Sequence, residues 1–161
     1  MSESFPMTPS CQAKLREELR RIKEVDRLDN VREIEAALEH GDLRENAEYH
    51  AAKERQAAID ARMRYVEYRL SKAQVIDPAK GTSDRVAFGA TVKLLDMDTD
   101  AEVSYSLVGE DESDAERGWV SITSPIARAL LGKSEGDDVV VRLPKGNREF
   151  ELLSVQYVAL T

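Results

Sequence analysis

Hydrophobic residues in the first half of the chain recur every three or four positions, a spacing typical of helices with one apolar face. The first such stretch contains Leu15, Leu19, Ile22, Val25, Leu28, Val31, Ile34 and Leu38. The second contains Tyr49, Ala52, Gln56, Ile59, Met63, Val66, Leu70 and Ala73. A short polar segment separates two stretches of nearly equal length, so we predict an antiparallel helical hairpin of coiled-coil type.

The pairing of the two helices follows from where the turn lies. A turn centred near residue 43 predicts the contacts Ile34 with Ala52, Leu28 with Ile59, Ile22 with Val66 and Leu15 with Ala73. Legs of about 27 residues at ~1.5 Å per residue would make the hairpin roughly 40 Å long. The polar residues 26–30 weaken the first stretch. Asn30 and Glu33 have the spacing of a capping pair, which predicts that the helix breaks and restarts there.

The second half of the chain contains shorter runs in which apolar and polar residues alternate, as is typical of β-strands. The predicted strands are residues 91–95, 102–108, 119–123, 139–143 and 149–155. A short helix interrupts them, because Pro125 suits a first helical turn and Gly132 suits a helix end. We predict an α+β protein with three parts: a hairpin domain, residues 1–77; a linker, residues 78–86; and a small α+β domain, residues 87–161.

Charge and composition limit the partners of such a protein. The formal net charge is −8, so we expect no strong binding to free duplex DNA. Cys11 is the only cysteine, which excludes an intramolecular disulfide and suits a reducing compartment. The chain has neither a signal-peptide core nor 18 consecutive apolar residues. We expect a soluble, cytoplasmic protein that does not bind membranes and whose residues 1–6 form a loose end.

Residues 41–49, with the sequence GDLRENAEY, form the predicted hairpin tip and allow two interpretations. In the structural one, Gly41 ends the first helix in a left-handed conformation, Asp42 is the N-cap of the second helix, and Glu45 completes a capping box. In the functional one, the carboxylates of Asp42 and Glu45 hold Mg²⁺ that keeps most of its waters. Two carboxylates cannot fill an octahedral shell. The functional interpretation therefore requires a macromolecular partner that supplies the other ligands.

Four segments carry a resemblance to a known family. They are GDLRENAEYHAAKERQ at residues 41–56, AQVID at 73–77, FGATV at 88–92 and SITSPIARALLG at 121–132. They resemble the bacterial transcript cleavage factors of the Gre family, and the resemblance extends from about Met7 to the end of the chain. It implies that the second domain has an FKBP-like fold. We expect no prolyl isomerase activity from that fold, because the sequence indicates no aromatic-lined pocket.

The resemblance also implies a function. Members of the family insert the coiled coil into the secondary channel of bacterial RNA polymerase and stimulate its intrinsic cleavage of backtracked RNA, which rescues arrested complexes. Asp42 and Glu45 would assist catalysis by helping to hold a second Mg²⁺ beside the nascent RNA 3′ end, with the two ions ~4 Å apart. The metal would be shared only within the complex, and the isolated chain would bind none tightly. The chain would thus be a cofactor of the polymerase and not itself an enzyme.

Two alternatives stay open beside this interpretation. One is an inhibitor of the same fold that occupies the channel without promoting cleavage. The other is a coiled-coil adaptor whose tip has no metal chemistry. Measuring RNA cleavage in stalled polymerase complexes separates all three.

Further residues receive expected roles from the resemblance. Arg44 and Lys53 would lie near the RNA, and Ser124, Pro125 and Arg128 would contribute to docking on the polymerase. Three positions depart from residues that are common in the family, namely Leu38 in place of a basic residue, Leu28 in place of Pro and Cys11 in place of Gly.

Overall fold

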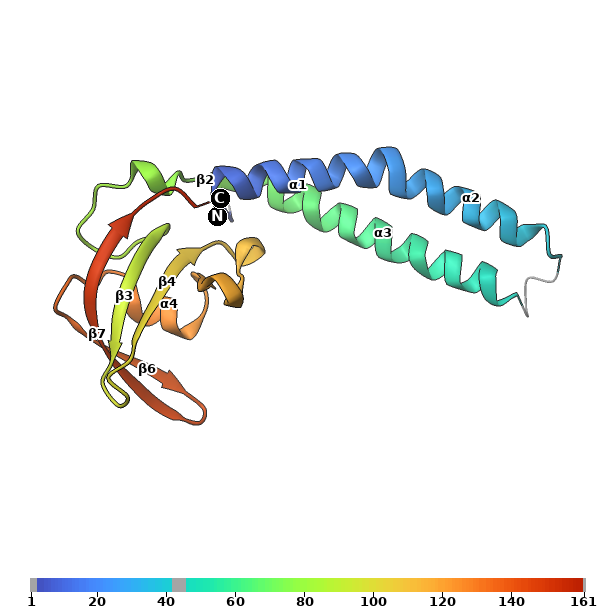
Figure 1. Cartoon of the computed structure of the whole chain (residues 1–161). Coiled ribbons are helices and arrows are strands. Elements are labelled where there is room, and N and C mark those ends of the chain that lie inside the picture. Colours follow the sequence, from blue (N-terminus) through green and yellow to red (C-terminus); the bar gives the residue numbers. More distant parts are fainter. Residues whose placement is uncertain (1–2, 42–45, 161) are drawn as a thin grey trace. The chain divides into compact units, whose positions relative to one another are not determined.

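The computed structural model describes residues 3–41 and 46–160 of the 161-residue chain. These residues form two compact units, and each is described by itself. One is a helical hairpin from Ala13 to Lys72, and the other combines the residues up to Gln12 with those from Ala73 onward. The predicted order, a helical hairpin followed by a β-sheet domain, is confirmed (Figure 1).

The hairpin has two legs of continuous helix. The first leg contains α1 (Pro9–Arg21), a π-helical segment η1 (Ile22–Asp26) and α2 (Arg27–Leu38), and the second leg is α3 (Ala47–Ser71). The predicted break at residues 26–30 is wrong. Asp26 and Arg27 keep α-helical dihedral angles, and no side chain caps a new helix start there. Asn30 lies inside α2, where its buried Nδ2 donates to the Ala52 carbonyl of the other leg at 2.9 Å.

The π-helical segment changes which residues face the other leg. From Ala13 onward, the buried residues of the first leg are Leu15, Ile22, Asn30 and Ala37, and those of α3 include Ala52 and Val66. The steps along the first leg are seven, eight and seven residues, and the step of eight spans η1. A π-turn accommodates one more residue than an α-turn, so the buried face moves by one position.

Four residues that we predicted to lie between the helices are exposed. They are Val25, Leu28, Val31 and Leu38, with exposed fractions of 38%, 54%, 46% and 46%. Ala52, which we predicted to face Ile34, accepts the hydrogen bond from Asn30. The Ile22 and Val66 positions are buried as predicted.

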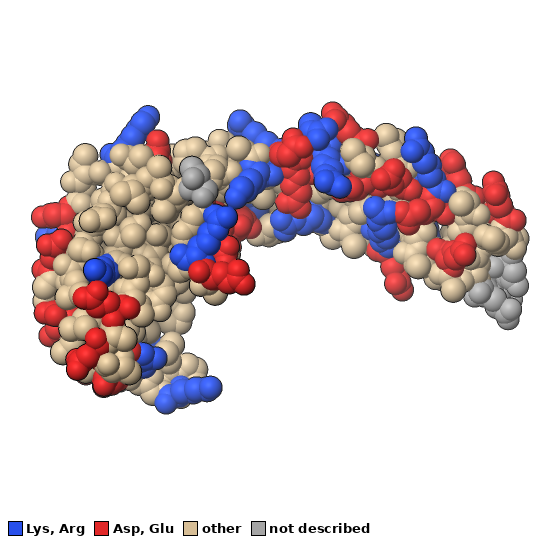
Figure 2. All heavy atoms as spheres, in the orientation of Figure 1, with Lys and Arg blue, Asp and Glu red and all other residues tan. Residues whose placement is uncertain are grey.

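Charged side chains of both signs are interspersed along the surface of the hairpin (Figure 2). Ion pairs between Arg and Glu side chains connect the legs. Arg62 donates to both carboxylate oxygens of Glu18 at 2.6 and 2.9 Å, and Arg55 pairs with Glu33. Pairs of this partly exposed kind contribute little to stability, so the narrow buried face carries most of the association of the two legs.

The second unit is built on a five-stranded sheet with the order β5-β4-β3-β7-β6. Its elements are η2 (Pro78–Lys80), β3 (Ala90–Asp96), β4 (Glu102–Val108), η3 (Glu110–Glu112), η4 (Ala115–Arg117), β5 (Trp119–Ser121), α4 (Pro125–Leu130), β6 (Asp138–Leu143) and β7 (Gly146–Tyr157). Neighbouring strands are antiparallel except β4 and β5, which are parallel. All five predicted strands, the helix after Ser124 and the α+β class are confirmed.

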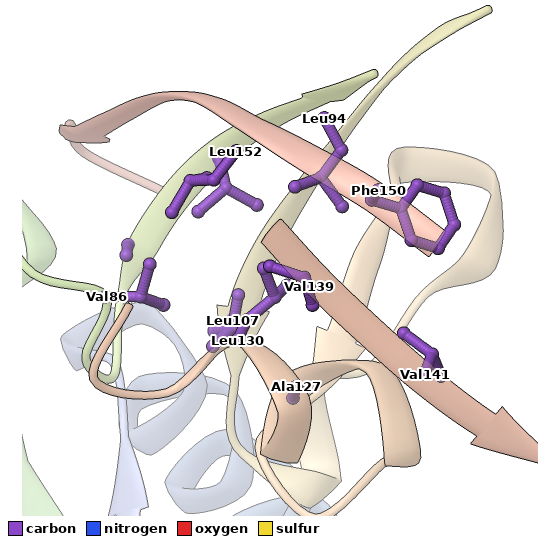
Figure 3. Close-up of a cluster of buried hydrophobic side chains, with 11 residues drawn as sticks. Val86, Leu94, Leu107, Ala127, Leu130, Val139, Val141, Phe150 and Leu152 are labelled. Atoms are coloured by element: carbon purple, nitrogen blue, oxygen red, sulfur yellow. The ribbon is translucent and has the colours of Figure 1, made fainter. Parts of the chain in front are cut away.

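The sheet packs against α4 around one hydrophobic core (Figure 3). Its fully buried members include Leu94, Leu107, Leu130, Val139 and Leu152. Val86 also belongs to this core. Its backbone N–H donates to the Lys133 carbonyl and its carbonyl accepts from Gly132 N–H, both at 2.8 Å. The last residue of the predicted linker is therefore an integral part of the sheet domain.

The N-terminal segment also belongs to this unit and is not the predicted loose end. Strand β1 (Phe5–Met7) pairs in parallel with β2 (Ala73–Val75). At the end of β1, Thr8 N–H donates to a carboxylate oxygen of Glu112 at 3.1 Å, and the Thr8 hydroxyl donates to the other oxygen. Gly109 lies so close that a Cβ there would be 2.4 Å from the Pro6 carbonyl oxygen, which explains the glycine. The chain thus enters and leaves the hairpin beside one strand pair.

Candidate functional site

The predicted tip begins where α2 ends. The backbone of Gly41 has a φ of +87°, which confirms its predicted left-handed conformation, and its N–H donates to the Leu38 carbonyl at 3.3 Å. Glycine adopts this conformation without the steric cost that a Cβ imposes. The predictions for Asp42, Arg44 and Glu45 concern residues outside the described part of the chain, so their catalytic, RNA-binding and metal-binding roles stay predictions.

Helix α3 begins after Asn46, and this residue is its N-cap. The Asn46 Oδ1 atom accepts a hydrogen bond from Tyr49 N–H at 3.0 Å. The prediction that Asp42 caps this helix is therefore wrong. We missed Asn46, although Asn is among the most favourable N-cap residues and here precedes a run of good helix formers. Its Nδ2 atom makes a second contact, donating to the Ala37 carbonyl at the end of the other leg at 2.6 Å.

The other described side chains near the tip are polar and exposed. His40 Nε2 lies 3.1 Å from a carboxylate oxygen of Glu48 on the facing leg. Lys53 is exposed on α3, and its ammonium donates to Gln56 Oε1 at 2.7 Å. Over residues 3–41 and 46–160, no group of three or more His, Cys, Asp and Glu side chains could hold a metal ion.

The predicted docking residues lie at the start of α4. The Ser124 hydroxyl accepts from Ala127 N–H at 3.3 Å and caps the helix, and Pro125 is the first residue of that helix. Pro125 and Arg128 are exposed. Capping explains why residue 124 is Ser. The first-turn position in α4 suits Pro125. The docking role stays a prediction for all three.

An apolar groove of about 230 Å³ lies beside Pro125. Its lining residues are Tyr105, Pro125, Ile126, Val141, Leu143, Arg148 and Phe150. The prediction that this domain has no aromatic-lined pocket is therefore wrong. The lining residues come from α4 and from the strands β4, β6 and β7. The two aromatic residues lie on β4 and β7, which are distant in sequence, so only the sheet order brings their rings together.

The polar edge of this groove is fixed by Arg148. Its guanidinium pairs with the buried carboxylate of Asp96 and lies 5.6 Å from the centroid of the Phe150 ring. The pKa of Asp96 is lowered, chiefly because Asp98 N–H donates to Oδ1 at 2.9 Å and also because of the hydrogen bond from Arg148. Asp96 thus stays ionised at neutral pH and keeps Arg148 in place along the groove.

Within the described part of the chain, no helix has both the length and the apolar character that crossing a bilayer requires.

Comparison with known proteins places both units in one family. Residues 5–75 match the family model described as transcription elongation factor, N-terminal, and residues 80–157 match transcription elongation factor, GreA/GreB, C-term. The chain belongs to the GreA/GreB family of transcription elongation factors. The resemblance predicted from the tip and from the segment around α4 is thereby confirmed. Membership makes the chain a transcription elongation factor and not a member of an enzyme family.

Individual GreA/GreB relatives are similar over nearly their whole length. The transcription elongation factor GreA of Anaeromyxobacter sp. (strain K) is 54% identical over 156 residues, which are 97% of this chain and 94% of the relative. GreA of Alkalilimnicola ehrlichii is 54% identical over 153 residues, 94% of this chain and 97% of the relative. Among solved structures, GreA factor homolog 1 (Gfh1) of Thermus thermophilus is 26% identical and covers 96% of this chain and 99% of its own, with a TM-score of 0.44.

Proposed function

We propose that this GreA/GreB-family chain binds bacterial RNA polymerase in the cytoplasm, enters its secondary channel with the hairpin, and stimulates the polymerase's own cleavage of backtracked RNA. The proposal rests on the position of two carboxylates, those of Asp42 and Glu45, in a chain that belongs to the GreA/GreB family. Asp42 and Glu45 lie in the segment that joins α2 to α3, where the hairpin turns. The 25 residues of α3 correspond to ~37 Å of helix, enough to reach a deeply buried reaction centre.

The donor set at the tip suits magnesium. Asp42 and Glu45 offer hard carboxylate oxygens, which Mg²⁺ prefers, and leave most of an octahedral shell for water, polymerase and the nascent RNA 3′ end. A metal shared in this way would stabilise the attacking and leaving oxygens of the cleavage reaction. The isolated chain supplies too few ligands, so its own affinity for Mg²⁺ is weak. Arg44 and Lys53 are suited to contact RNA phosphates, and the exposed ammonium of Lys53 is accessible for this.

The sheet domain supplies the docking surface in this proposal. Pro125 and Arg128 are exposed on α4, and the groove next to Pro125 offers apolar surface beside the guanidinium of Arg148. Apolar surface with a few placed polar groups is typical of a binding site. The hairpin also exposes large apolar side chains, among them Val25, Leu28 and Val31, so its own contacts inside the channel add to the binding in this proposal, and charged side chains of both signs lie along its surface (Figure 2).

The decisive experiment compares Asp42→Asn with the wild-type chain in stalled, backtracked polymerase complexes. The change removes a charge and keeps a side chain of similar size, so we expect the maximal rate of cleavage to fall about 100-fold, as when one catalytic electrostatic contact is lost. The melting temperature should be almost unchanged. Glu39→Gln is a matched control, since Glu39 is an exposed acid on the α2 side of the turn and lies outside residues 42–45.

Two outcomes would contradict the proposal. Full cleavage activity of Asp42→Asn would remove the catalytic role of the tip. A wild-type chain that slows RNA synthesis without producing cleavage products would instead be an inhibitor that occupies the channel. Repeating the cleavage assay over a range of Mg²⁺ concentrations tests the shared metal, because the factor should lower the concentration needed for half-maximal cleavage.

A further inference from the structure

Asn46 connects the two helix ends that border the tip. Its Oδ1 atom accepts from Tyr49 N–H in the first turn of α3, and its Nδ2 atom donates to the Ala37 carbonyl in the last turn of α2. The two partners also fix the orientation of the side-chain amide, because a backbone N–H can only donate and a carbonyl can only accept. Both polar atoms of one half-buried side chain are thus used, one on each leg.

Capping alone does not explain why this residue is asparagine. Ser, Thr and Asp satisfy the N-terminal N–H groups of a helix about as well as Asn. A Ser or Thr hydroxyl can also donate and accept, but only through one oxygen close to the backbone, and Asp has no donor when ionised, whereas Asn carries an acceptor for its own helix and a donor for the other leg on two separate atoms. The Ala37 carbonyl receives that donor together with the His40 N–H at 3.1 Å, so both of its acceptor positions are used. Ala37 is 1% exposed, which means that water does not readily replace the lost donor.

The position of this contact matters for the proposed chemistry. Ala37 is next to the last residue of α2, and Asn46 directly follows Glu45 in the sequence. The hydrogen bond between them therefore fixes the separation of the two described ends of the segment that carries Asp42 and Glu45. The other described polar contact across these ends, His40 with Glu48, is between exposed side chains and holds the geometry only weakly.

We propose that Asn46 is a positioning residue for the tip carboxylates and acts by holding the end of α2 to the start of α3. This inference rests on the proposed function. Small displacements of catalytic groups cost rate more than they cost binding. Loss of the contact should therefore lower the maximal rate of RNA cleavage and leave the concentration of factor for half-maximal stimulation unchanged.

The test variant is Asn46→Ser in the full-length chain. Serine keeps the cap on α3 and adds no charge beside the acids, but it has no donor that reaches Ala37. We expect a maximal cleavage rate about tenfold below that of the wild type. The control is Asn30→Ala, which removes another side-chain hydrogen bond between the legs, to Ala52, well away from the tip. Asn30→Ala should lower the melting temperature at least as much as Asn46→Ser does, and it should keep a nearly normal maximal rate of RNA cleavage.

A second measurement reports on the tip without any cleavage. Nitroxide labels on cysteines introduced at the exposed positions Ala36 and Ala51, in a Cys11→Ser background, measure the separation of the two legs near the turn. Asn46→Ser should broaden the distribution of label distances in the free protein, whereas Asn30→Ala should change it less. An unchanged distribution with Asn46→Ser would overturn the positioning role.

The cleavage assay can also overturn the inference. A normal maximal rate for Asn46→Ser would do so, as would an equal loss of rate for Asn30→Ala, because the effect would then reflect the stability of the whole hairpin. Absence of cleavage stimulation by the wild-type chain would refute the proposed function instead. In that case the label distances alone decide whether Asn46 holds the two helix ends.

Discussion

The hairpin and the sheet domain solve the problem of burying apolar surface in opposite ways. The sheet domain encloses eleven buried hydrophobic residues between strands and α4. The hairpin buries fewer residues, which lie seven or eight positions apart along its first leg. They include a polar residue, Asn30, and in α3 a cation, Arg69. The sheet domain is therefore stabilised by its own core. The hairpin leaves most of both helices at the surface, as suits its proposed entry into RNA polymerase.

The core of the sheet domain should be the most sensitive part of the chain. Leu130 is completely buried in α4, and Leu130→Ala should reduce the free energy of unfolding by about 3 kcal/mol, because it leaves a cavity in a closely packed core. Urea unfolding followed by the fluorescence of Trp119, the only tryptophan, reports on this domain. The helical circular dichroism signal, which comes mostly from the hairpin, should shift less. Equal shifts of both signals would show that the hairpin depends on the core of the sheet domain for its stability.

The hairpin should respond more weakly to the loss of its buried polar contact. Asn30→Ala removes one hydrogen bond between the legs and should cost about 1 kcal/mol of hairpin stability, the usual net value of such a bond. The helical circular dichroism signal measures this effect, and Trp119 fluorescence serves as the internal control. A gain in stability would mean that Asn30 serves to fix the pairing of the legs at a cost in stability, as buried polar residues do in some coiled coils.

The sheet domain should also lose stability in acid through Asp96. The pKa of this carboxyl is lowered in the folded protein, chiefly by the Asp98 N–H, so its contribution to stability is fully present above about pH 4, near the ordinary pKa of 3.8. The contribution is lost as the pH falls through the lowered pKa. Thermal melting between pH 6 and pH 2 should therefore show a steeper decline for the wild type than for Asp96→Asn. Parallel profiles for the two proteins would contradict this assignment.

The smallest effect is expected from a surface ion-pair group on the hairpin. Arg20 donates to Glu17 at 2.6 Å and to Glu24 at 2.7 Å, and all three side chains are at least half exposed. These contacts raise the pKa of Arg20 and lower that of Glu17. Water and salt nevertheless screen such pairs. Arg20→Gln should leave the melting temperature unchanged within experimental error at physiological salt, and a clear decrease would show that surface charges stabilise the hairpin more than its geometry indicates.

The sheet domain could be predicted well because its signals are local. Several of the strands from β3 to β7 alternate apolar and polar residues, and the helix after Ser124 has both its cap and its proline in sequence. What the sequence did not reveal depends on sheet order. Tyr105 and Phe150 lie on β4 and β7, and nothing in either strand alone indicates that their rings line one groove. Strand β1 is only three residues long and pairs with residues 73–75, so it left no recognisable pattern.

The hairpin was predicted as an element, but several residues of its first leg were wrongly predicted to face the other leg. Val25, Leu28 and Val31 continue the spacing of three residues, and that spacing pointed to them as the buried face. The π-helical segment Ile22–Asp26 shifts the face by one position, and an irregularity of a single residue has no distinct signature in hydrophobicity. At the tip, a capping box starting at Asp42 looked complete, and Asn46, which caps α3, was overlooked.

The pairing of β1 with β2 has a consequence for the architecture as a whole. Because residues 5–7 lie beside residues 73–75, the sixty residues from Ala13 to Lys72 are in effect a long insertion within a single domain, whose first and last residues meet at one surface. Lengthening such an insertion costs little chain entropy, since the closure term grows only logarithmically with length. The length of the hairpin can therefore be altered by adding or removing matched helical turns in both legs, with the sheet domain left untouched.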